Sequence, residues 1–354
     1  MGCAQAQSHG SAPVPAAKDR RKFAKAYDLT GTVIAQGVHS QTCLAKRRQD
    51  GLVVAVKARH TKDPISGAPS EQLLFQAQEE SKLWLLISGH PRVAVLHEAF
   101  VERSSTYMVS EYVERSLLEA LDQERILSEA LLARYLADML EGLQHLHACG
   151  IIHCDARPPS FRVHTKSRRV KVCDFGSAHY AQKQAHLGRA LGDLLFVAPE
   201  VAAGKPYDQK VDLFALGVFV HAMLYGTLPS TCCCADHSSG LEHHGEASIS
   251  TEGKSLCRQL LESQPAVRGG TAEALEHPWV ARWRVTAEDD QNLGPSSSSR
   301  PAPEMRHHLL EACRLGVFGK QGLVRGVQWA DEDESTQLPT SNFGTSLTAS
   351  SVAL

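Results

Sequence analysis

The feature that most constrains the fold is a change in apolar periodicity near Ser116. Between Tyr27 and this point, apolar residues mostly come in short runs separated by turn residues, as in YDLTGTVIA, QTCLAKR and GLVVAVKARH. Such runs are typical of antiparallel strands. Beyond Ser116 the apolar residues recur at helical spacing, most clearly over residues 127–150, with Gly150 as the stop signal. This order predicts an α+β fold whose strand-built and helical parts form two lobes around a cleft.

One segment of the first part has helical spacing. In EQLLFQAQEESKLWLLIS, residues 71–88, apolar side chains recur with Glu and Gln between them. We therefore expect a single helix beside the strands of the first lobe.

The charge balance and the short apolar runs exclude several classes of protein. The 354 residues include 37 Lys and Arg against 39 Asp and Glu, a net charge of −2 that gives no bias toward nucleic acid. No apolar run reaches the roughly 20 residues that a membrane span needs. The ten Cys form no recognisable disulfide framework, and the N-terminus lacks a secretory signal. We expect a cytoplasmic protein with no nucleic-acid partner.

Both ends of the chain have the composition of tails. Residues 1–26 are rich in small and basic residues and predict a flexible basic tail, and residues 284–354 predict a mostly disordered one. Within the latter, residues 305–329 have the basic and apolar side chains of an amphipathic helix, which suits the groove of a calmodulin-like partner. Three glycines weaken that helix, so a packed or partly disordered tail is the alternative.

Two further signals concern lipids and metals. Gly2 and Cys3 would present a myristoyl site beside a palmitoyl site, which predicts membrane association, although Ala6 stands where the pattern prefers Ser or Thr. A plain soluble tail is the alternative. Residues 232–234 are consecutive cysteines with histidines nearby, but adjacent cysteines do not easily share a tetrahedral zinc centre, so we favour a loop there.

Three segments in a fixed order carry the chemistry, namely VVAVKARH, IIHCDARPPSF and VKVCDFGSAH. Lys57 lies in an apolar strand, so its ammonium needs a counter-charge, which a nucleotide phosphate and a helix carboxylate would supply. Asp174 follows a strand and precedes a turn that includes a Gly, where a carboxylate is well placed to ligate Mg²⁺. Asp155 follows the long helix and would face the same cleft, where it could accept a hydroxyl proton.

Each segment alone occurs by chance, but their order, followed by FVAPE, resembles the eukaryotic protein kinase superfamily. The resemblance covers residues 27–283 and implies a protein kinase-like domain with a small β-rich N-lobe containing one helix and a larger α-helical C-lobe. The closing LEHPWV resembles the calcium/calmodulin-dependent kinase group. Together with MGC and KFAKAYDL, it is most similar to the protein serine kinase H family.

The resemblance implies ATP and Mg²⁺ as cofactors and a role for each matching residue. Lys57 would hold the phosphates, with Glu80 as its helix partner and Glu79 as the competitor. Asp155 would be the catalytic base and Asp174 the main Mg²⁺ ligand. The remaining expectations are nucleotide binding by Ala55, Glu111 and Val113, alignment of the motifs by His153 and Phe175, support of the catalytic loop by Asp212, and an ion pair between Glu200 and Arg268.

The sequence departs from the family at several of these positions. Only Gly37 remains of the glycines that cover the phosphates. Arg157 stands where the family has a Lys near the transferring phosphate, and it would keep that catalytic charge on a bulkier, planar group. Ser160 replaces the Asn that ligates the second metal ion, and its hydroxyl could still ligate Mg²⁺ with a shorter reach. Cys154 replaces the Arg that, in the family, binds a phosphorylated activation segment. No Ser or Thr lies between Ser177 and Glu200.

Three functions are compatible with these residues. The first is a pseudokinase or very weak kinase that binds ATP and Mg²⁺ and acts as a signalling scaffold or switch toward a protein partner. The second is an active protein serine/threonine kinase, because Lys57, Asp155 and Asp174 all remain. The third, a small-molecule phosphotransferase, is disfavoured by FVAPE, Asp212 and Arg268, which belong to the helical lobe of protein kinases.

Overall fold

The computed structural model describes residues 23–37, 39–62, 67–102, 105–124, 127–181, 194–229 and 249–284. Gly2, Cys3, residues 232–234 and the segment 305–329 lie outside these ranges. The elements in chain order are α1 Phe23–Ala26, β1 Tyr27–Gln36, β2 Ser40–Arg47, β3 Val53–His60, α2 Glu71–Ile87, β4 Leu96–Val101, β5 Ser105–Glu111, β6 Arg115–Ser116, α3 Leu117–Gln123, α4 Glu129–Ala148, β7 Ile151–Ile152, η1 Pro158–Ser160, β8 Phe161–Val163, β9 Val170–Val172, β10 His179–Tyr180, η2 Leu194–Phe196, α5 Pro199–Ala202, α6 Lys210–Tyr225, α7 Thr251–Leu260, α8 Pro265–Arg268, α9 Thr271–Glu276 and α10 Pro278–Ala281.

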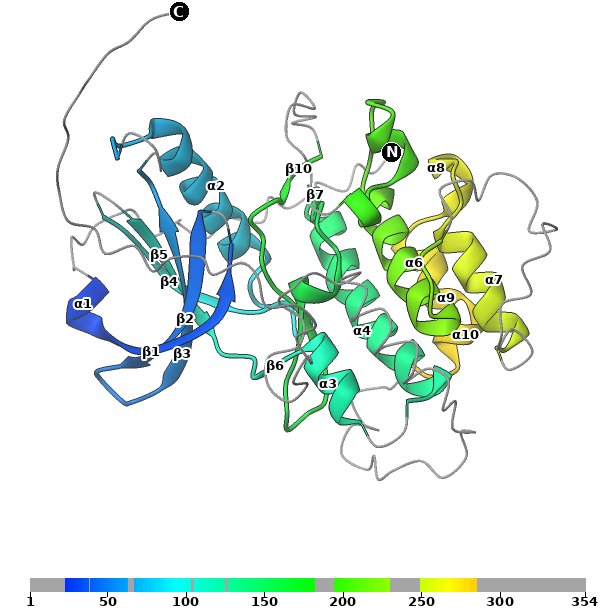
Figure 1. The fold of residues 1–354 in the computed structure, drawn as a ribbon, viewed down its shortest axis with the longest axis horizontal. Helices are drawn as coiled ribbons and strands as arrows, with labels where there is room; N and C mark the ends of the chain where they lie inside the picture. The colour runs from blue at the N-terminus through cyan, green and yellow to red at the C-terminus, as the bar shows by residue number, and fades with distance from the viewer. Residues whose placement is uncertain are drawn as a thin grey trace, which may run out of the picture.

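The predicted α+β architecture with two lobes is confirmed (Figure 1). In the first lobe, five antiparallel strands form a sheet in the order β1-β2-β3-β5-β4, with α2 against one face. β3 is the middle strand, and its residues 54–56 are almost completely buried. In the register of the sheet, Lys57 lies opposite Thr42 on β2 and Met108 on β5. The lysine is therefore fixed by a strand that is hydrogen-bonded on both sides.

The expected flexible tail ends earlier than residue 26. Residues 23–26 form the short helix α1, and Phe23 is only 5% exposed. Its ring stacks on Tyr27 and Tyr107 with centroids 5.5 and 4.5 Å away and meets Phe100 edge-on. This correction has a simple cause, since an aromatic cluster on the sheet stabilises the last residues of what composition alone marks as a tail.

α2 carries the features that fix its position against the sheet. The Ser70 side chain accepts a hydrogen bond from the backbone N–H of Leu73, which caps the first turn. Toward the other end, the buried Trp84 indole donates to the Ala94 carbonyl at 2.7 Å. The helix is thus held at both ends, with Glu80 between them on its buried side.

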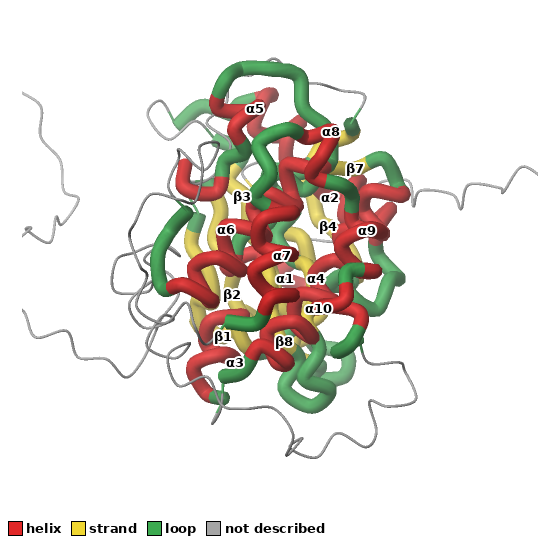
Figure 2. The backbone as a smooth tube through the Cα atoms, turned by 90° about the vertical axis from the view of Figure 1, so that its right-hand side faces the viewer, coloured by secondary structure: helices red, strands yellow, loops and turns green. Residues whose placement is uncertain are grey.

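The second lobe is helical and is built around α4 and α6. Figure 2, which views the molecule from this lobe, shows α6, α7, α9 and α10 in front of the strands. The N-cap of α4 is Ser128, and the chain leaves this helix through Gly150, whose φ is 72°. α6 is buried along nearly its whole length, which places Asp212 in the interior. No helix in the described ranges is both long and apolar enough to cross a membrane.

Short strands connect this helical core to the cleft. β6, β8 and β9 form a three-stranded sheet, and β7 pairs with β10. The backbone of Val172 on β9 exchanges hydrogen bonds with Arg92 and Ala94 of the first lobe. The segments with the expected catalytic motifs are therefore anchored to both lobes.

A buried ion pair holds the second lobe together away from the cleft. Arg268, with 0% exposure, donates to both carboxylate oxygens of Glu200 at 2.8 and 3.0 Å. It also donates to the carbonyls of Glu262 and Lys210. This bidentate arrangement satisfies most of the guanidinium in a place that water does not reach.

We expect Glu200→Gln to lower the free energy of unfolding by about 3–5 kcal/mol, because it leaves the buried Arg268 charge without its carboxylate. Denaturant unfolding followed by circular dichroism measures the change. Asp28→Asn is the matched control, because its partner Arg48 is exposed and such pairs contribute less than about 1 kcal/mol. Equal losses in the two variants would contradict the structural role of the Glu200–Arg268 pair.

Candidate active site

Lys57 lies at the centre of the candidate site. Its Nζ is 2.5 Å from Glu80 Oε1 on α2 and 2.6 Å from Asp174 Oδ1 after β9. Burial opposes the charged form of this lysine, but Asp174 and Glu80 together raise its pKa above the ordinary value. The ammonium therefore stays charged and joins strand, helix and loop at one point.

The Glu80 carboxylate is shared by two cations. Its second oxygen accepts a hydrogen bond from Arg59 Nη1 at 2.5 Å, and the same guanidinium donates to Gln76 at 3.1 Å. The competitor Glu79 instead pairs with Lys82 on the surface of α2, at 3.1 Å. Arg59 was not among the residues expected in the site. It follows Lys57 by two positions on β3, so the alternation of the strand puts both side chains on one face.

Asp174 has a backbone conformation that few residues adopt. Its φ is 59°, in the left-handed region that Asp and Asn tolerate better than most side chains. The Lys57 ammonium holds the pKa of its carboxyl well below the ordinary range. The side chain is 53% exposed, so part of the carboxylate remains accessible to a cation.

The following residue, Phe175, is completely buried and holds the motifs in line. Its ring lies 5.3 Å from that of Trp84 on α2 and 5.6 Å from that of His153 in the loop after β7. His153 Nε2 also lies 3.1 Å from the Cys173 carbonyl. Contacts between these rings thus connect α2, the segment around Asp174 and the loop that contains Asp155.

Asp212 supports that loop from α6. Its two carboxylate oxygens accept hydrogen bonds from the backbone N–H groups of His153 and Cys154 at 2.9 and 2.8 Å. Burial alone would raise the pKa of Asp212, but His147 and His153 hold it below the ordinary value. The anionic carboxylate favours the loop conformation, in which Cys154 has a φ of 61°.

The Asp155 carboxylate is tied to its own loop. Arg157 Nε donates to Asp155 Oδ1 at 2.5 Å, and the Ser160 hydroxyl donates to the Asp155 carbonyl at 2.6 Å. Burial raises the pKa of Asp155, and the positive charge of Arg157 opposes that shift. Ser160 is 1% exposed, so its hydroxyl is directed at the loop backbone in this structure.

The other expected nucleotide-binding residues line the connection between the lobes. Ala55, 7% exposed, lies on β3 opposite Ser110, Glu111 ends β5, and Val113 is buried beyond it. The Glu111 side chain accepts from the Val95 backbone at 2.9 Å and from Lys171 at 2.5 Å. Ala55 thus comes from the middle of the sheet, Glu111 from the end of β5 and Val113 from the segment that follows it.

Gly37 lies in the turn between β1 and β2, where its N–H donates to the Ser40 carbonyl at 2.7 Å. A Cβ at this position would come within 2.8 Å of the Ser40 hydroxyl. A side chain at this position would therefore require the Ser40 hydroxyl to move.

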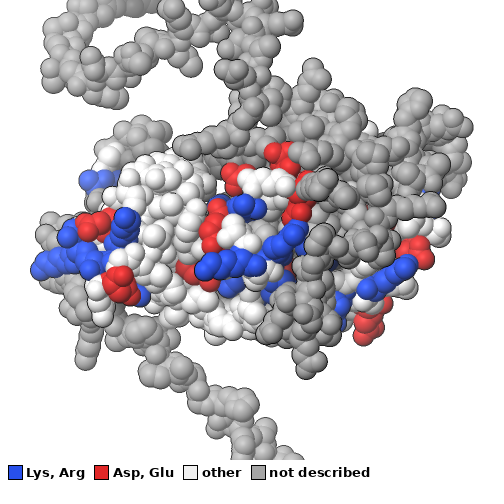
Figure 3. Space-filling model, turned by 90° about the horizontal axis from the view of Figure 1, so that it is seen from below, with Lys and Arg blue, Asp and Glu red and all other residues white. Residues whose placement is uncertain are grey.

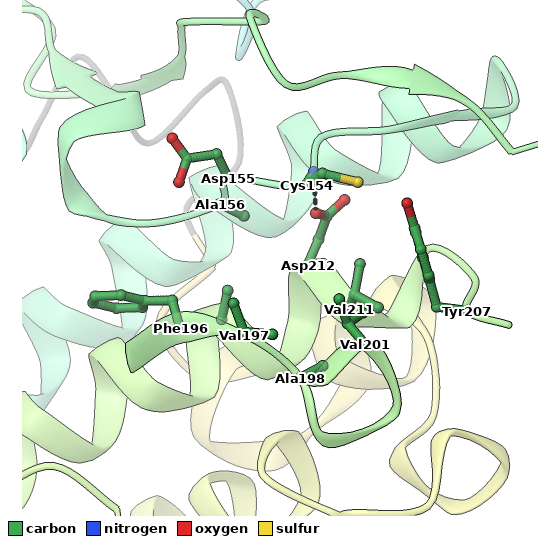
Figure 4. Close-up of a pocket in the computed structure, with 11 residues that line it drawn as sticks. Cys154, Asp155, Ala156, Phe196, Val197, Ala198, Val201, Tyr207, Val211 and Asp212 are labelled. Atoms are coloured by element: carbon green, nitrogen blue, oxygen red, sulfur yellow. Dashed lines mark hydrogen bonds between the residues drawn. The ribbon is translucent and has the colours of Figure 1, made fainter. Parts of the chain in front are cut away.

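A pocket opens beside Asp155 (Figure 4). Its walls are mostly apolar and come from the catalytic loop, the segment 196–201 and the start of α6. The figure shows the Tyr207 hydroxyl pointing toward the Cys154 sulfur. The His179 ring lies 3.6 Å from Cys154 Sγ and 3.1 Å from the Tyr207 hydroxyl. Burial raises the pKa of the Cys154 thiol, so it stays protonated.

Sequence reasoning missed the charged residues around the site. Arg59, Arg162 and Lys171 contact Glu80, the carbonyls of residues 113 and 114, and Glu111. Arg162 and Lys171 lie between apolar neighbours on their strands, as in FRV and VKV, and Arg59 follows Lys57 by two positions in KARH. That alternation was the available signal, because it directs every second side chain away from the core.

The sheet lysine, the carboxylate of α2 and the two acidic loops define the active-site frame of a protein kinase. A family model for the protein kinase domain matches residues 30–280, and the chain belongs to this family. It is a member of the eukaryotic protein kinase superfamily.

Several curated kinases are similar over most of the chain. An Aurora kinase of Yarrowia lipolytica is 26% identical over 72% of this chain and 69% of its own length. The CBL-interacting protein kinase 22 of Oryza sativa is 26% identical over 85% of this chain and 72% of its own length. The serine/threonine-protein kinase cds1 of Schizosaccharomyces pombe is 32% identical over 78% of this chain and 63% of its own length. The relatives thus include kinases of the expected calcium/calmodulin-dependent group.

The residues present fit a nucleotide with its metal ion. A Cβ on Gly176 would come within 3.1 Å of Lys57 Nζ and 3.4 Å of Asp174 Oδ1, so the glycine keeps this corner open. The described residues contain no cluster of three or more protein ligands for a metal. Mg²⁺ does not require one, because it commonly takes one or two carboxylates together with phosphates and water.

Arg157→Gln should raise the pKa of Asp155 further. The arginine favours the ionised carboxylate, so its removal leaves burial unopposed, and the group protonates at a higher pH. A titration of carbon-13-labelled carboxyl groups by NMR measures the pKa without requiring any enzymatic activity. Arg168→Gln, which removes a cation bound to Glu124, is the control. A fall in the pKa of Asp155 in Arg157→Gln would contradict this account.

Proposed function

We propose that this protein kinase binds ATP with Mg²⁺ but transfers the phosphoryl group very slowly, and that it acts mainly as a signalling scaffold or switch. The observation that supports binding is the Lys57 ammonium, which lies within 2.6 Å of carboxylates from both lobes. A phosphate could share this cation, while Glu80 and Arg59 keep the sheet and α2 in place. Ala55, Glu111 and Val113 are proposed to hold the base.

The proposal of slow transfer rests on the loop around Asp155. Bound ATP with Mg²⁺ would supply the transferable phosphoryl group. Asp155 would orient a substrate hydroxyl and accept its proton, but Arg157 occupies one carboxylate oxygen of this base. Ser160, where the family has a metal-binding Asn, is buried and donates to a backbone carbonyl.

Phosphoryl transfer depends on positioning and electrostatics, so small displacements multiply. A loss of about 4 kcal/mol in transition-state stabilisation would lower the rate roughly a thousandfold. Nucleotide binding tolerates such losses better than turnover does. The protein partner would then recognise the nucleotide-bound conformation and not depend on phosphorylation.

An active serine/threonine kinase is the second candidate. It is favoured by the packing of Phe175 between Trp84 and His153, which aligns Lys57, Asp155 and Asp174 without any modification. The mostly apolar pocket beside Asp155 could receive a side chain of a protein substrate. Phosphate incorporation distinguishes this candidate from the first.

Asp174→Asn tests the nucleotide proposal, because Asn keeps the size and tolerates the left-handed backbone but lacks the charge. Saturating ATP and Mg²⁺ should stabilise the wild type, by about 2.7 kcal/mol at a hundredfold excess over Kd, and the Mg²⁺-dependent part should disappear in the variant. Thermal unfolding with and without Mg²⁺ measures both. Asp50→Asn is the control, because the exposed Asp50 carboxylate pairs with Arg47 on the surface.

Two results would overturn parts of this proposal. No stabilisation of the wild type by ATP and Mg²⁺ would contradict nucleotide binding. Phosphate incorporation that is readily measured in the wild type and lost in Asp174→Asn would replace slow transfer with the active kinase.

We further propose that Gly2 and Cys3 are acylated and hold this otherwise cytoplasmic protein at membranes, and that residues 305–329 bind a calmodulin-like partner. The support is sequence alone, namely the adjacent acceptor residues with a basic patch and the basic amphipathic pattern.

Gly2→Ala should move the full-length protein from the membrane to the soluble fraction of cells, since it removes the myristoyl acceptor. Ala4→Gly, which keeps Gly2 and Cys3, is the control. An unchanged distribution of Gly2→Ala would refute acylation as the membrane anchor.

A further inference from the structure

Two cations lie side by side on the floor of the cleft. On β8, Phe161 and Val163 are buried with exposures of 0 and 3%, so Arg162 between them faces the opposite side. Lys171 has the same position on β9, between two buried valines. The register pairs Arg162 directly with Lys171, so both side chains project from one face of this small sheet.

That face lies against the segment that connects the lobes. Arg162 Nε donates to the Val113 carbonyl at 2.7 Å, and its Nη2 donates to the Glu114 carbonyl at 3.0 Å. Lys171 is engaged by Glu111 at 2.5 Å. The guanidinium therefore binds the backbone of the connecting segment through two charge-assisted hydrogen bonds.

The strand that pairs with β8 leads to Asp174. Arg162 lies opposite Lys171 on β9, and the chain continues from β9 through Cys173 to Asp174. The same guanidinium binds the carbonyls of Val113 and Glu114. It therefore lies between the connecting segment at Val113 and the strand that leads to Asp174.

We propose that Arg162 covers the nucleobase subsite in this conformation and must be displaced when a purine nucleotide binds. This inference rests on the proposed nucleotide-binding function and deepens it. A planar group with N–H donors already occupies backbone acceptors beside Val113, so an incoming base has to compete with it. The Arg162 side chain would thereby lower the affinity of the protein for the nucleotide.

Figure 3 shows basic and acidic side chains alternating across one face of the described part of the molecule, with no broad patch of one sign. We expect the effect of Arg162 to come from its own hydrogen bonds to the connecting segment. Hydrogen bonds of charged groups are worth enough that removing the competitor should tighten binding roughly ten- to a hundredfold.

The experiment measures the Kd of Mg²⁺–ADP by isothermal titration calorimetry for the full-length protein and three variants. Arg162→Leu should bind about tenfold tighter or more, because leucine leaves the connecting segment free and adds an apolar floor. Arg162→Gln removes the charge but keeps a donor, so its Kd should lie between those of the wild type and Arg162→Leu. Arg115→Leu is the matched control, an exposed arginine on neighbouring β6, and should bind within about twofold of the wild type.

Each result decides the question. Equal or weaker binding by Arg162→Leu, while the wild type still binds, would overturn the inference and leave the proposed function intact; weaker binding would mean that the guanidinium stacks on the base instead. Failure of both the wild type and Arg162→Leu to bind would overturn nucleotide binding and this inference together. If Arg162→Leu does not fold, Arg162→Gln decides by the same comparison with the wild type.

Discussion

The structure depends on one buried ammonium group. Lys57 could not remain charged within a nearly buried strand without counter-charges, and the chain supplies Glu80 from α2 and Asp174 from the other side of the cleft. Satisfying this lysine requires the sheet, the helix and the acidic loop to converge. Arg59 adds a second cation to Glu80, and the indole of Trp84 fixes the same helix through a backbone carbonyl. The convergence is therefore built into the contacts of the strand, the helix and the acidic loop.

The carboxylates of Asp174 and Asp155 differ in how far neighbouring groups cover them. The Asp174 carboxylate is half exposed, whereas Asp155 is engaged by Arg157 and Ser160 hydroxyl is turned to the loop backbone. Asp212 meanwhile holds the loop itself through two backbone N–H groups. The backbone of this loop is thus well supported. Its differences from the family pattern concern the groups that the Arg157 and Ser160 side chains can contact.

The sequence predicted the two lobes, the central lysine strand and helix α2, because periodicity and burial act over many residues; it did not predict the short α1 of the first lobe. It also indicated Glu200 and Arg268, since a motif fixes their types. It did not predict Arg59, Arg162 or Lys171, whose roles depend on which face of a short strand meets another segment. The burial of Phe23 was also missed. Its ring is held by Tyr27, Phe100 and Tyr107, which belong to strands of the sheet and not to the segment that composition marks as a tail. Contacts that depend on strand register cannot be predicted from the local sequence pattern.

The contact between Lys57 and Asp174 joins residues 117 positions apart, and the helical lobe also depends on distant contacts, since α4 packs on α9 and α10. Closing so long a loop has a large entropic cost that is recovered only when both partners are already shaped. The strand pairs β1–β2, β2–β3 and β4–β5 join sequence neighbours, so we expect these hairpins to form before the cleft closes. A chain with its hairpins paired and its cleft still open would leave the Lys57 ammonium in water.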